Sequence, residues 1–287
     1  MPGLLVFRLQ LPLIITTRFA ATSRRDGNAL FAMTRQLDVY ALPSLARDLP
    51  EDGVSVAIDV LRATTTITTA LANGAARVLP FESIGETLSA KSAIVKERPE
   101  DADSVLLGGE RGGVLIGGFD LDNSPKSYSR EKVEGKTILF TTTNGAKAIL
   151  SCRGVVYIAS FLNAEAVARR LLAPGAPERV SIVCAGTNGQ YTEEDLLLAG
   201  ALADRLTSGK EKFALNVQAE VAREQYRVGR GRPLVDALKA SRGGQNLKKV
   251  KLLGDVYDAA KIDSLDVVPE FRDGEIRLFA DSDASTN

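Results

Sequence analysis

The stretch from Val54 to Ala72, VSVAIDVLRATTTITTALA, constrains the fold of this 287-residue chain more than any other. An apolar strand ends there in Asp59, Arg62 follows, and the threonines at 64–66 open a predicted helix over 65–72. A parallel strand releases polar side chains at its carboxyl end, where the next helix directs its free amide N–H groups. This combination suits a divalent cation and a phosphate. Asp59 and Arg62 could also form a buried ion pair, and one guanidinium can hold both a carboxylate and a substrate oxyanion.

Predicted strands and helices alternate along most of the chain, which is typical of an α/β fold. We expect a three-layer α/β/α arrangement, with helices on both faces of a mostly parallel or mixed sheet. The helical pattern continues from residue 210 to about residue 259, and residues 267–279 form a predicted hairpin that turns at Asp273-Gly274. The predicted strands are 37–41, 54–60, 77–81, 105–107, 137–141, 155–159 and 180–184, and the predicted helices are 65–72, 84–97, 124–133, 164–172 and 192–206.

Residues 64–81 and 141–161 share a threonine triplet, an Ala-rich helix, a short strand and a closing Phe. This likeness indicates two similar halves, unless it only reflects the general resemblance of βα units. Residues 1–32 look foreign to the rest, and Met33 is the only methionine besides Met1, so we predict an extraneous or disordered N-terminal extension. A transit peptide or poor signal sequence is the alternative. Residues 33–280 then form one domain, and the polar residues 281–287 a disordered tail.

The chain contains no histidine and only two cysteines. Ser-His-Asp and Cys-His catalysis are therefore excluded, and so are the usual zinc sites. Any metal must be held by oxygen ligands, which favours Mg²⁺. Lys plus Arg equals Asp plus Glu at 36 each, so nothing indicates a nucleic-acid or membrane-surface partner.

Two further segments carry candidate site residues. Glu110-Arg111 lies inside GGERGG, where glycines let the backbone approach a ligand and charged side chains rarely serve packing; a solvated turn is the alternative. The same glycine-dense segment ends in Asp120 and in Asn123-Ser124-Pro125. An Asx turn that caps the predicted helix 124–133 would explain Asn123 without a binding role.

The pattern of strand, polar turn and helix occurs twice more. Thr141-Thr142-Thr143-Asn144-Gly145, with Lys147 one turn later, forms a predicted anion cradle, although GxxxxGK[ST] is absent. After the strand that ends at Cys184, the acidic residues 193–195 stand at a helix start. They are either metal or water ligands or a simple complement to the helix dipole. Cys184 is more plausible as a small buried residue than as a nucleophile, because no histidine can activate it.

Together these residues resemble the 2-phosphosulfolactate phosphatase (ComB-like) family. The resemblance runs in family order from about residue 37 to 206, and weaker similarity extends beyond it. Asp122 stands where glycine is expected before NSP, and Ala146 where threonine is favoured after TTTNG. The matching segments are IDVLRATTTI (58–67), LANGA (71–75), LGGER (107–111), GFDLDNSP (118–125), GKTILFTTTNGA (135–146), SFLNA (160–164), CAG (184–186) and EDLLLAG (194–200).

The resemblance implies Mg²⁺-dependent hydrolysis of 2-phospho-3-sulfolactate to 3-sulfolactate and phosphate, a step toward coenzyme M in methanogens. It implies a small anionic phosphoester as partner, no nucleic acid, no membrane and a cytoplasmic location; a homodimer is compatible with the chain's size. Catalytic roles are expected for Asp59, Arg62, Glu110 and Arg111, substrate binding for Thr64, Thr65, Thr141, Thr142, Thr143, Asn144, Gly145, Asn123 and Ser124, and metal binding for Asp59, Glu110, Asp120, Glu194 and Asp195.

Other activities stay open at this point. The same scaffold could hydrolyse another small anionic phosphoester, or the protein could bind phosphorylated metabolites without catalysis. The attack on phosphorus is open as well, because water can attack directly or Asp59 or Cys184 can form a phosphoenzyme. We favour direct attack, since Asp59 lacks the DxD context of aspartyl-phosphate hydrolases.

Overall fold

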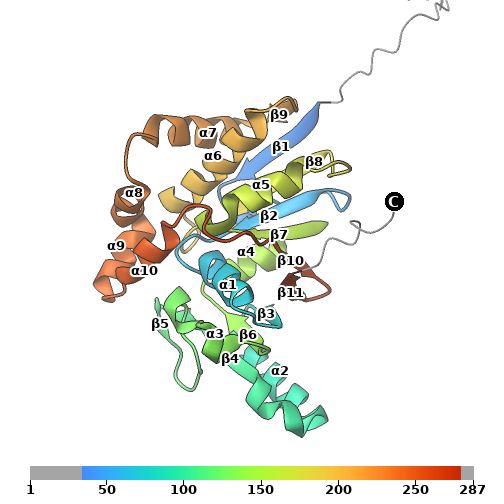
Figure 1. Ribbon diagram of the computed structural model, residues 1–287, viewed down its shortest axis with the longest axis vertical. Helices are drawn as coiled ribbons and strands as arrows, with labels where there is room; N and C mark the ends of the chain where they lie inside the picture. Colours follow the sequence, from blue (N-terminus) through green and yellow to red (C-terminus); the bar gives the residue numbers. More distant parts are fainter. Residues whose placement is uncertain (1–33, 279–287) are drawn as a thin grey trace, which may run out of the picture. The chain divides into compact units, whose positions relative to one another are not determined.

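The structure, a computed structural model, describes residues 34–278 (Figure 1). The predicted extension at 1–32 and the predicted tail at 281–287 lie outside the described residues. Within 34–278 the chain forms an eleven-stranded sheet in the order β5-β4-β6-β3-β11-β10-β7-β2-β8-β1-β9. The strands are β1 (Arg35–Tyr40), β2 (Val54–Ile58), β3 (Arg77–Phe81), β4 (Val105–Arg111), β5 (Val114–Leu115), β6 (Thr137–Thr141), β7 (Val155–Ala159), β8 (Arg179–Cys184), β9 (Phe213–Leu215), β10 (Pro269–Arg272) and β11 (Glu275–Leu278).

The sheet consists of two parallel blocks joined by an antiparallel hairpin, with β5 added antiparallel to β4 at one edge. Strands β4, β6 and β3 pair in parallel, and so do β7, β2, β8, β1 and β9. Between the blocks, β7–β10, β10–β11 and β11–β3 are all antiparallel, so the two blocks run in opposite senses. The hairpin turns at Asp273-Gly274, as predicted.

Helices cover both faces of the sheet, which confirms the three-layer α/β/α fold (Figure 1). The α-helices are α1 (Ala63–Ala72), α2 (Ile84–Glu97), α3 (Arg130–Val133), α4 (Gly145–Ser151), α5 (Ala164–Leu172), α6 (Glu193–Thr207), α7 (Val217–Gly229), α8 (Leu234–Ala240), α9 (Arg242–Lys249) and α10 (Gly254–Ala259). Along β2, Val54, Val56 and Ile58 pack into a core with α5, α6 and α7, whereas Ala57 faces a second core with α1 and α4.

Three predicted elements were wrong or incomplete. The single helix at 124–133 is instead a 3-10 turn, Pro125–Ser127, followed by the short α3, because Ser129 has the extended backbone of an N-cap between them. Strand β9 interrupts the helical pattern predicted after residue 210, since Phe213–Leu215 adds to the edge of β1. Strand β4 runs to Arg111, so Glu110-Arg111 ends a paired strand and is not a solvated turn.

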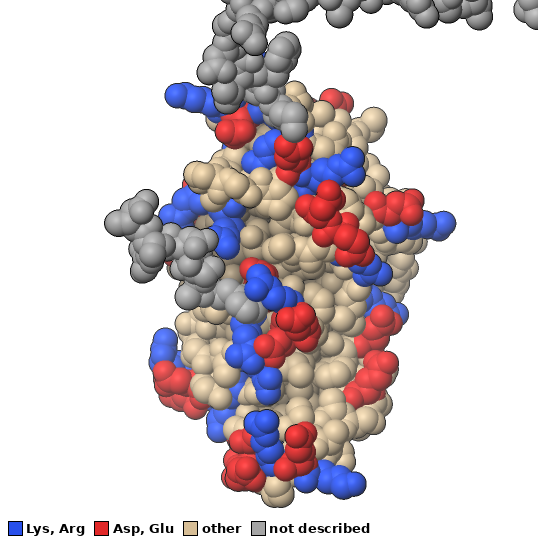
Figure 2. Space-filling view, turned by 90° about the vertical axis from the view of Figure 1, so that its right-hand side faces the viewer, with Lys and Arg blue, Asp and Glu red and all other residues tan. Residues whose placement is uncertain are grey.

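The described surface mixes both signs of charge. On the face shown in Figure 2, Lys and Arg alternate with Asp and Glu, and neither sign forms a continuous field. Among the described residues, none of the helices combines the length and the apolarity needed to cross a bilayer. The predicted absence of nucleic-acid and membrane partners stays a prediction.

Helices α6 and α7 pack closely at Gly200, where an added Cβ would lie 2.0 Å from the Ala222 carbonyl oxygen. We expect Gly200→Ala to lower the free energy of unfolding by about 2 kcal/mol, because backbone must move to relieve the contact. Gly85 in α2 is the matched control, since a Cβ there meets nothing within 4 Å. Gly85→Ala should be neutral or stabilise by about 0.5 kcal/mol. Urea unfolding of both variants measures the difference, and equal effects would contradict the close packing.

Candidate active site

A cavity of about 260 Å³ lies where the carboxyl ends of β2 and β4 and the loop after β6 meet. We call it the Asp59 cavity; it is lined by Asp59, Leu61, Arg62, Glu110, Gly112, Gly113, Asn123, Thr143, Asn144, Thr187, Asn188, Gly243, Asn246, Leu247, Lys249 and Val250. The lining thus combines both blocks of the sheet with helix α9. Of the groups predicted to converge, Asp59, Glu110 and the loop at Thr143 meet here, although the two blocks run in opposite senses.

Asp59 follows β2 directly and is only 9% exposed. Its backbone is held by Thr64, whose hydroxyl donates to the Asp59 carbonyl over 2.9 Å and accepts the Asp59 N–H over 3.1 Å. Helix α4 approaches closely, because Gly145 has no side chain: a Cβ there would lie 2.6 Å from Asp59 Oδ2. The local structure leaves the Asp59 carboxylate at the cavity wall.

Asp59, Glu194 and Asp195 form a buried carboxylate cluster. Burial raises the pKa of Asp59 to about 7, and the negative charges of Glu110 and Glu194 add to the effect. Burial also raises the pKa of Glu194 and of Asp195 to about 7, with Asp195 and Asp59 as their respective charged neighbours. Arg62 opposes the shift of Asp59 only weakly. The cluster therefore favours a bound proton or a cation near neutral pH.

Asp195 and Glu194 accept hydrogen bonds from the backbone of the loops around the cavity. Asp195 Oδ1 accepts the Val60 N–H over 2.9 Å, and Oδ2 accepts the Gly186 N–H over 3.0 Å. Glu194 Oε1 accepts the Gly243 N–H over 3.0 Å, whereas its buried Oε2 has no partner among the described residues. Both side chains are almost fully buried and neither lines the Asp59 cavity.

Glu110 lines the cavity from the end of β4. Its Oε1 accepts the Thr143 N–H over 2.8 Å, and its Oε2 accepts the Gly113 N–H over 2.7 Å. Because each oxygen holds a different loop, this carboxylate orders two cavity walls at once. One lone pair on each oxygen stays available for a further contact.

Arg62 pairs with Asp255 of α10, so the ion pair considered between Arg62 and Asp59 is wrong. The Arg62–Asp255 distance is 2.7 Å, and both side chains are almost fully buried. Arg62 Nη2 also donates to the Gly113 carbonyl over 2.7 Å, and the Ser124 hydroxyl donates to Asp255 Oδ1 over 2.6 Å. Arg62 lines the cavity, but its charge is neutralised by Asp255.

Asp122 makes the Asx turn, because its Oδ1 accepts the Ser124 N–H over 2.9 Å, so Asn123 is not the capping residue.

Two residues of the cavity lining each carry a buried side-chain oxygen. Asn123 Oδ1 and Thr143 Oγ1 are both buried without a partner among the described residues, and both residues line the cavity. Such oxygens are costly in a finished interior and are available to a ligand.

Several predicted site residues lie away from the cavity. Asp120 accepts the Leu107 N–H over 2.7 Å and lies 3.4 Å from Lys91 Nζ. Arg111 donates to the Thr141 hydroxyl over 2.9 Å and to the carbonyls of Glu110 and Glu82. The remaining predicted residues outside the lining are Thr64, Thr65, Thr141, Thr142, Gly145, Ser124, Glu194 and Asp195. Of these, Thr65 donates to the Val60 carbonyl and Thr142 accepts the Ala146 N–H.

Sequence reasoning missed the lining residues from α9, the pair Thr187-Asn188, and Asp255. One signal for Thr187-Asn188 was present: the tripeptide Thr-Asn-Gly occurs at 143–145 and again at 187–189. The two loops meet, since Asn144 Oδ1 accepts the Asn188 N–H over 3.1 Å. Nothing comparable marks α9 or Asp255, which reach the site only through tertiary packing.

Both cysteines are buried. Burial raises the pKa of the Cys184 thiol well above its usual range and that of Cys152 to about 12. Cys184 is fully buried and does not line the Asp59 cavity. A thiolate nucleophile at Cys184 is therefore disfavoured.

The donor set fits Mg²⁺ with few protein ligands. Within residues 34–278 no three acidic or cysteine side chains form a ready metal cluster. However, Mg²⁺ commonly binds one or two carboxylates and completes its octahedron with waters and substrate phosphate. The Asp59 carboxylate with the unpartnered oxygens of Asn123 and Thr143 offers such a set of hard ligands.

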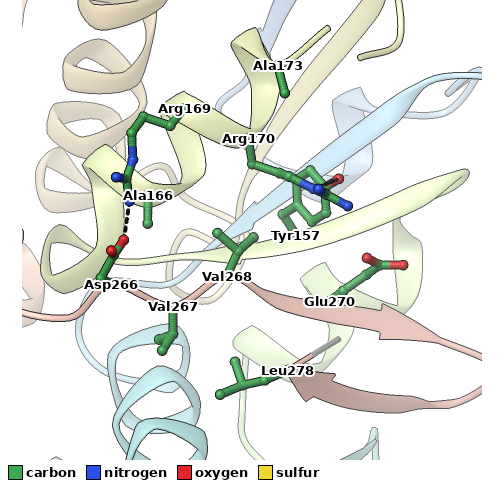
Figure 3. Close-up of a pocket in the computed structure, with 10 residues that line it drawn as sticks. All are labelled: Tyr157, Ala166, Arg169, Arg170, Ala173, Asp266, Val267, Val268, Glu270 and Leu278. Carbon is green, nitrogen blue, oxygen red and sulfur yellow. Dashed lines mark hydrogen bonds and ion pairs between the residues drawn. The ribbon is translucent and has the colours of Figure 1, made fainter. Parts of the chain in front are cut away.

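A larger cavity, of about 630 Å³, lies beside α5, β7 and β10 (Figure 3). Its charged side chains have partners: Arg169 pairs with Asp266, Glu270 pairs with Arg272, and Arg170 Nε donates to the Tyr157 hydroxyl over 3.2 Å. None of the predicted site residues lines it. The carboxylate cluster and the unpartnered oxygens instead favour the Asp59 cavity as the active site.

Comparison with known proteins bears on this site. The family model described as 2-phosphosulpholactate phosphatase matches residues 40–274. A protein of Symbiobacterium thermophilum, named probable 2-phosphosulfolactate phosphatase, is 44% identical over 227 residues, which are 78% of this chain and 94% of the relative. Proteins with the same name are 36% identical over 239 residues in Clostridium botulinum (83% and 96%) and 39% identical over 240 residues in Caldanaerobacter subterraneus (82% and 94%).

The raised pKa of Glu194 predicts a pH-dependent stability of the metal-free protein. The folded state keeps a proton that the unfolded chain loses near pH 4.5, so this contribution is complete below pH 4.5 and is lost as the pH rises to about 7. We expect Glu194→Gln, which keeps an acceptor for Gly243, to reduce this loss by up to about 3 kcal/mol. Urea unfolding at pH 5 and pH 8 measures it. The exposed Glu193→Gln is the control, and an unchanged slope in Glu194→Gln would contradict the assignment.

Proposed function

This chain belongs to the 2-phosphosulfolactate phosphatase family, and from that premise we propose that its Asp59 cavity hydrolyses 2-phospho-3-sulfolactate to 3-sulfolactate and phosphate with bound Mg²⁺. The observation that carries the proposal is the buried Asp59 carboxylate at the cavity wall, beside Glu110 and without a neutralising guanidinium. A carboxylate of this kind is costly unless it serves a cation or the reacting groups.

The cavity suits a small phosphoester. Its volume of about 260 Å³ accommodates a three-carbon acid better than a nucleotide. Neither Asp122 nor Ala146, the two departures from the family pattern, lines the cavity itself.

Mg²⁺, when bound, would be held by Asp59 with the side-chain oxygens of Asn123 and Thr143 nearby, and would supply positive charge that polarises the phosphoryl group and acidifies a bound water. The protein contributes positioning. Glu110 accepts the N–H groups of Gly113 and Thr143, and these two hydrogen bonds fix the loops that form two walls of the cavity. Arg62, fixed by Asp255, adds an oriented donor on the cavity wall.

Direct attack by water is the mechanism we propose. The Asp59 carboxylate, at the cavity wall, can accept a proton from the attacking water as the water oxygen bonds to phosphorus, and can give that proton to the ester oxygen that leaves with 3-sulfolactate. The Cys184 thiol, which is buried and protonated, offers no competing nucleophile. Hydrolysis of another small anionic phosphoester, or binding without catalysis, would appear as alternative outcomes of the tests below. A homodimer and a place in coenzyme M synthesis stay predictions from the resemblance.

We expect Asp59→Asn to lower the kcat for 2-phospho-3-sulfolactate by about 10³-fold or more, because the proton acceptor and the main metal ligand are lost together. The fold should persist or gain stability, since a buried charge is removed. Phosphate release with Mg²⁺, with chelator and with Mg²⁺ restored measures the effect, and thermal unfolding checks the fold.

Asp120→Asn is the matched control, because Asp120 was also predicted as a metal ligand but contacts Leu107 and Lys91 and does not line the cavity. Its kcat/KM should stay within about threefold of wild type. A loss as large as that of Asp59→Asn would contradict the location of the site. Wild-type protein that releases no phosphate with Mg²⁺ would contradict the phosphatase proposal itself.

A further inference from the structure

The Asp59 cavity has two cationic side chains in its lining, and they differ in how they are bound. Arg62 is neutralised by Asp255 and also donates to the Gly113 carbonyl. Lys249, by contrast, is exposed, and its side chain has no ion pair or hydrogen bond to any described residue. Its ammonium is therefore the cation in this lining that is available to a ligand.

Lys249 is carried by α9, a helix that is held firmly against the site. The Gly243 N–H donates to Glu194 Oε1, and the Ser241 hydroxyl caps the helix by accepting the Gly244 N–H over 3.3 Å. Gly243 packs so closely that a Cβ would lie 2.1 Å from Glu194 Oε1. Glu194, a member of the carboxylate cluster with Asp59, thus also fixes the position of α9.

Helix α9 presents Asn246 and Lys249 together. Residues three apart lie on the same side of a helix, and both of these line the cavity. The neighbouring Lys248 is also exposed but does not line it. An ammonium with an amide one turn before it forms a small set of donors for an anion, on the wall that the C-terminal helices contribute.

The charges in the cavity require such donors. Asp59 and Glu110 repel an anionic substrate, and the proposed Mg²⁺ compensates chiefly at the reacting phosphate. Two anionic groups of 2-phospho-3-sulfolactate, the carboxylate and the sulfonate, still need partners. A planar carboxylate suits the fork of an arginine, whereas a tetrahedral sulfonate with three equivalent oxygens suits the compact, freely rotating ammonium of a lysine.

We propose that Lys249, with Asn246, binds the sulfonate of the substrate, so that α9 makes the site selective for phosphoesters with a second tetrahedral anion. The assignment rests on the proposed function. It adds that the chemistry and the selectivity come from different parts of the chain: the strand ends hold the phosphate, and the C-terminal helices hold the distal anion.

Paired substrates test this assignment. We would compare 2-phospho-3-sulfolactate with 2-phospholactate, which lacks the sulfonate, in wild type, Lys249→Gln, Lys249→Arg and the control Lys248→Gln. We expect Lys249→Gln to lower kcat/KM for the sulfonated ester by about 10–100-fold, mainly through KM, and to change the other ester by less than about threefold. Lys249→Arg should recover most of the loss because it keeps the charge, and Lys248→Gln should match wild type.

Equal losses for both esters would overturn the assignment, since a general effect on folding or on the phosphate would produce them. No loss in Lys249→Gln would overturn it as well. Calorimetric binding of 3-sulfolactate separates this inference from the activity: the product should bind Lys249→Gln about 10–100-fold more weakly than wild type even if no phosphate is released. If wild type hydrolyses neither ester but the binding difference is observed, the phosphatase proposal is refuted and the role of Lys249 stands. If 3-sulfolactate binds wild type and Lys249→Gln equally, the role of Lys249 is refuted.

Discussion

Three buried carboxylates, none of which forms an ion pair with a described residue, are the constraint on which the site depends. Asp59, Glu194 and Asp195 each carry a pKa raised to about 7 by burial and by one another. Charge of one sign in a low dielectric is tolerated only where dipoles or a cation compensate it. The chain supplies the dipoles from backbone, since the N–H groups of Val60, Gly186 and Gly243 all donate to Asp195 or Glu194. These bonds tie together the loop after β2, the loop after β8 and the start of α9. The same buried carboxylates that repel one another therefore also hold the surrounding loops in place.

The order of the strands does not by itself explain how such distant loops meet. In an open parallel sheet, all strands release their polar ends along one edge. Here the hairpin of β10 and β11 reverses one block relative to the other, yet β2 of one block and β4 and β6 of the other still end at one cavity. The contacts that join the blocks there are specific: Glu110 holds the Thr143 N–H, and Gly145 lets α4 approach Asp59. The site is thus a junction between the two blocks, which accounts for its lining by segments from residue 59 to residue 250.

The sequence predicted the parts of this site that are properties of single strands. Asp59, Glu110 and the loop at Thr143 each follow an apolar strand, and that local pattern was sufficient to place them at the cavity. It failed for Asp120, because the glycine-dense segment folds back so that its carboxylate bonds to the backbone of Leu107. It also missed Asp255, whose pairing with Arg62 joins residues 193 positions apart and leaves no mark on either neighbourhood. Burial beside a strand end is thus readable from local sequence, whereas the identity of a charge partner depends on the packed structure.

The groups proposed for the chemistry and the donors proposed for substrate selectivity lie on different elements, and this separation affects how substrate preference can change within one fold. The groups proposed for the chemistry stand at strand ends, where backbone hydrogen bonds and close glycine contacts leave little freedom for change. The donors on α9 differ, because Asn246 and Lys249 are exposed side chains on a helix whose position is set by other residues, Gly243 and Ser241. A substitution on the exposed side of a fixed helix alters contacts with a ligand without disturbing the fold beneath it. The cavity wall formed by α9 is therefore the part of this site where substrate preference can change while the carboxylate cluster stays intact.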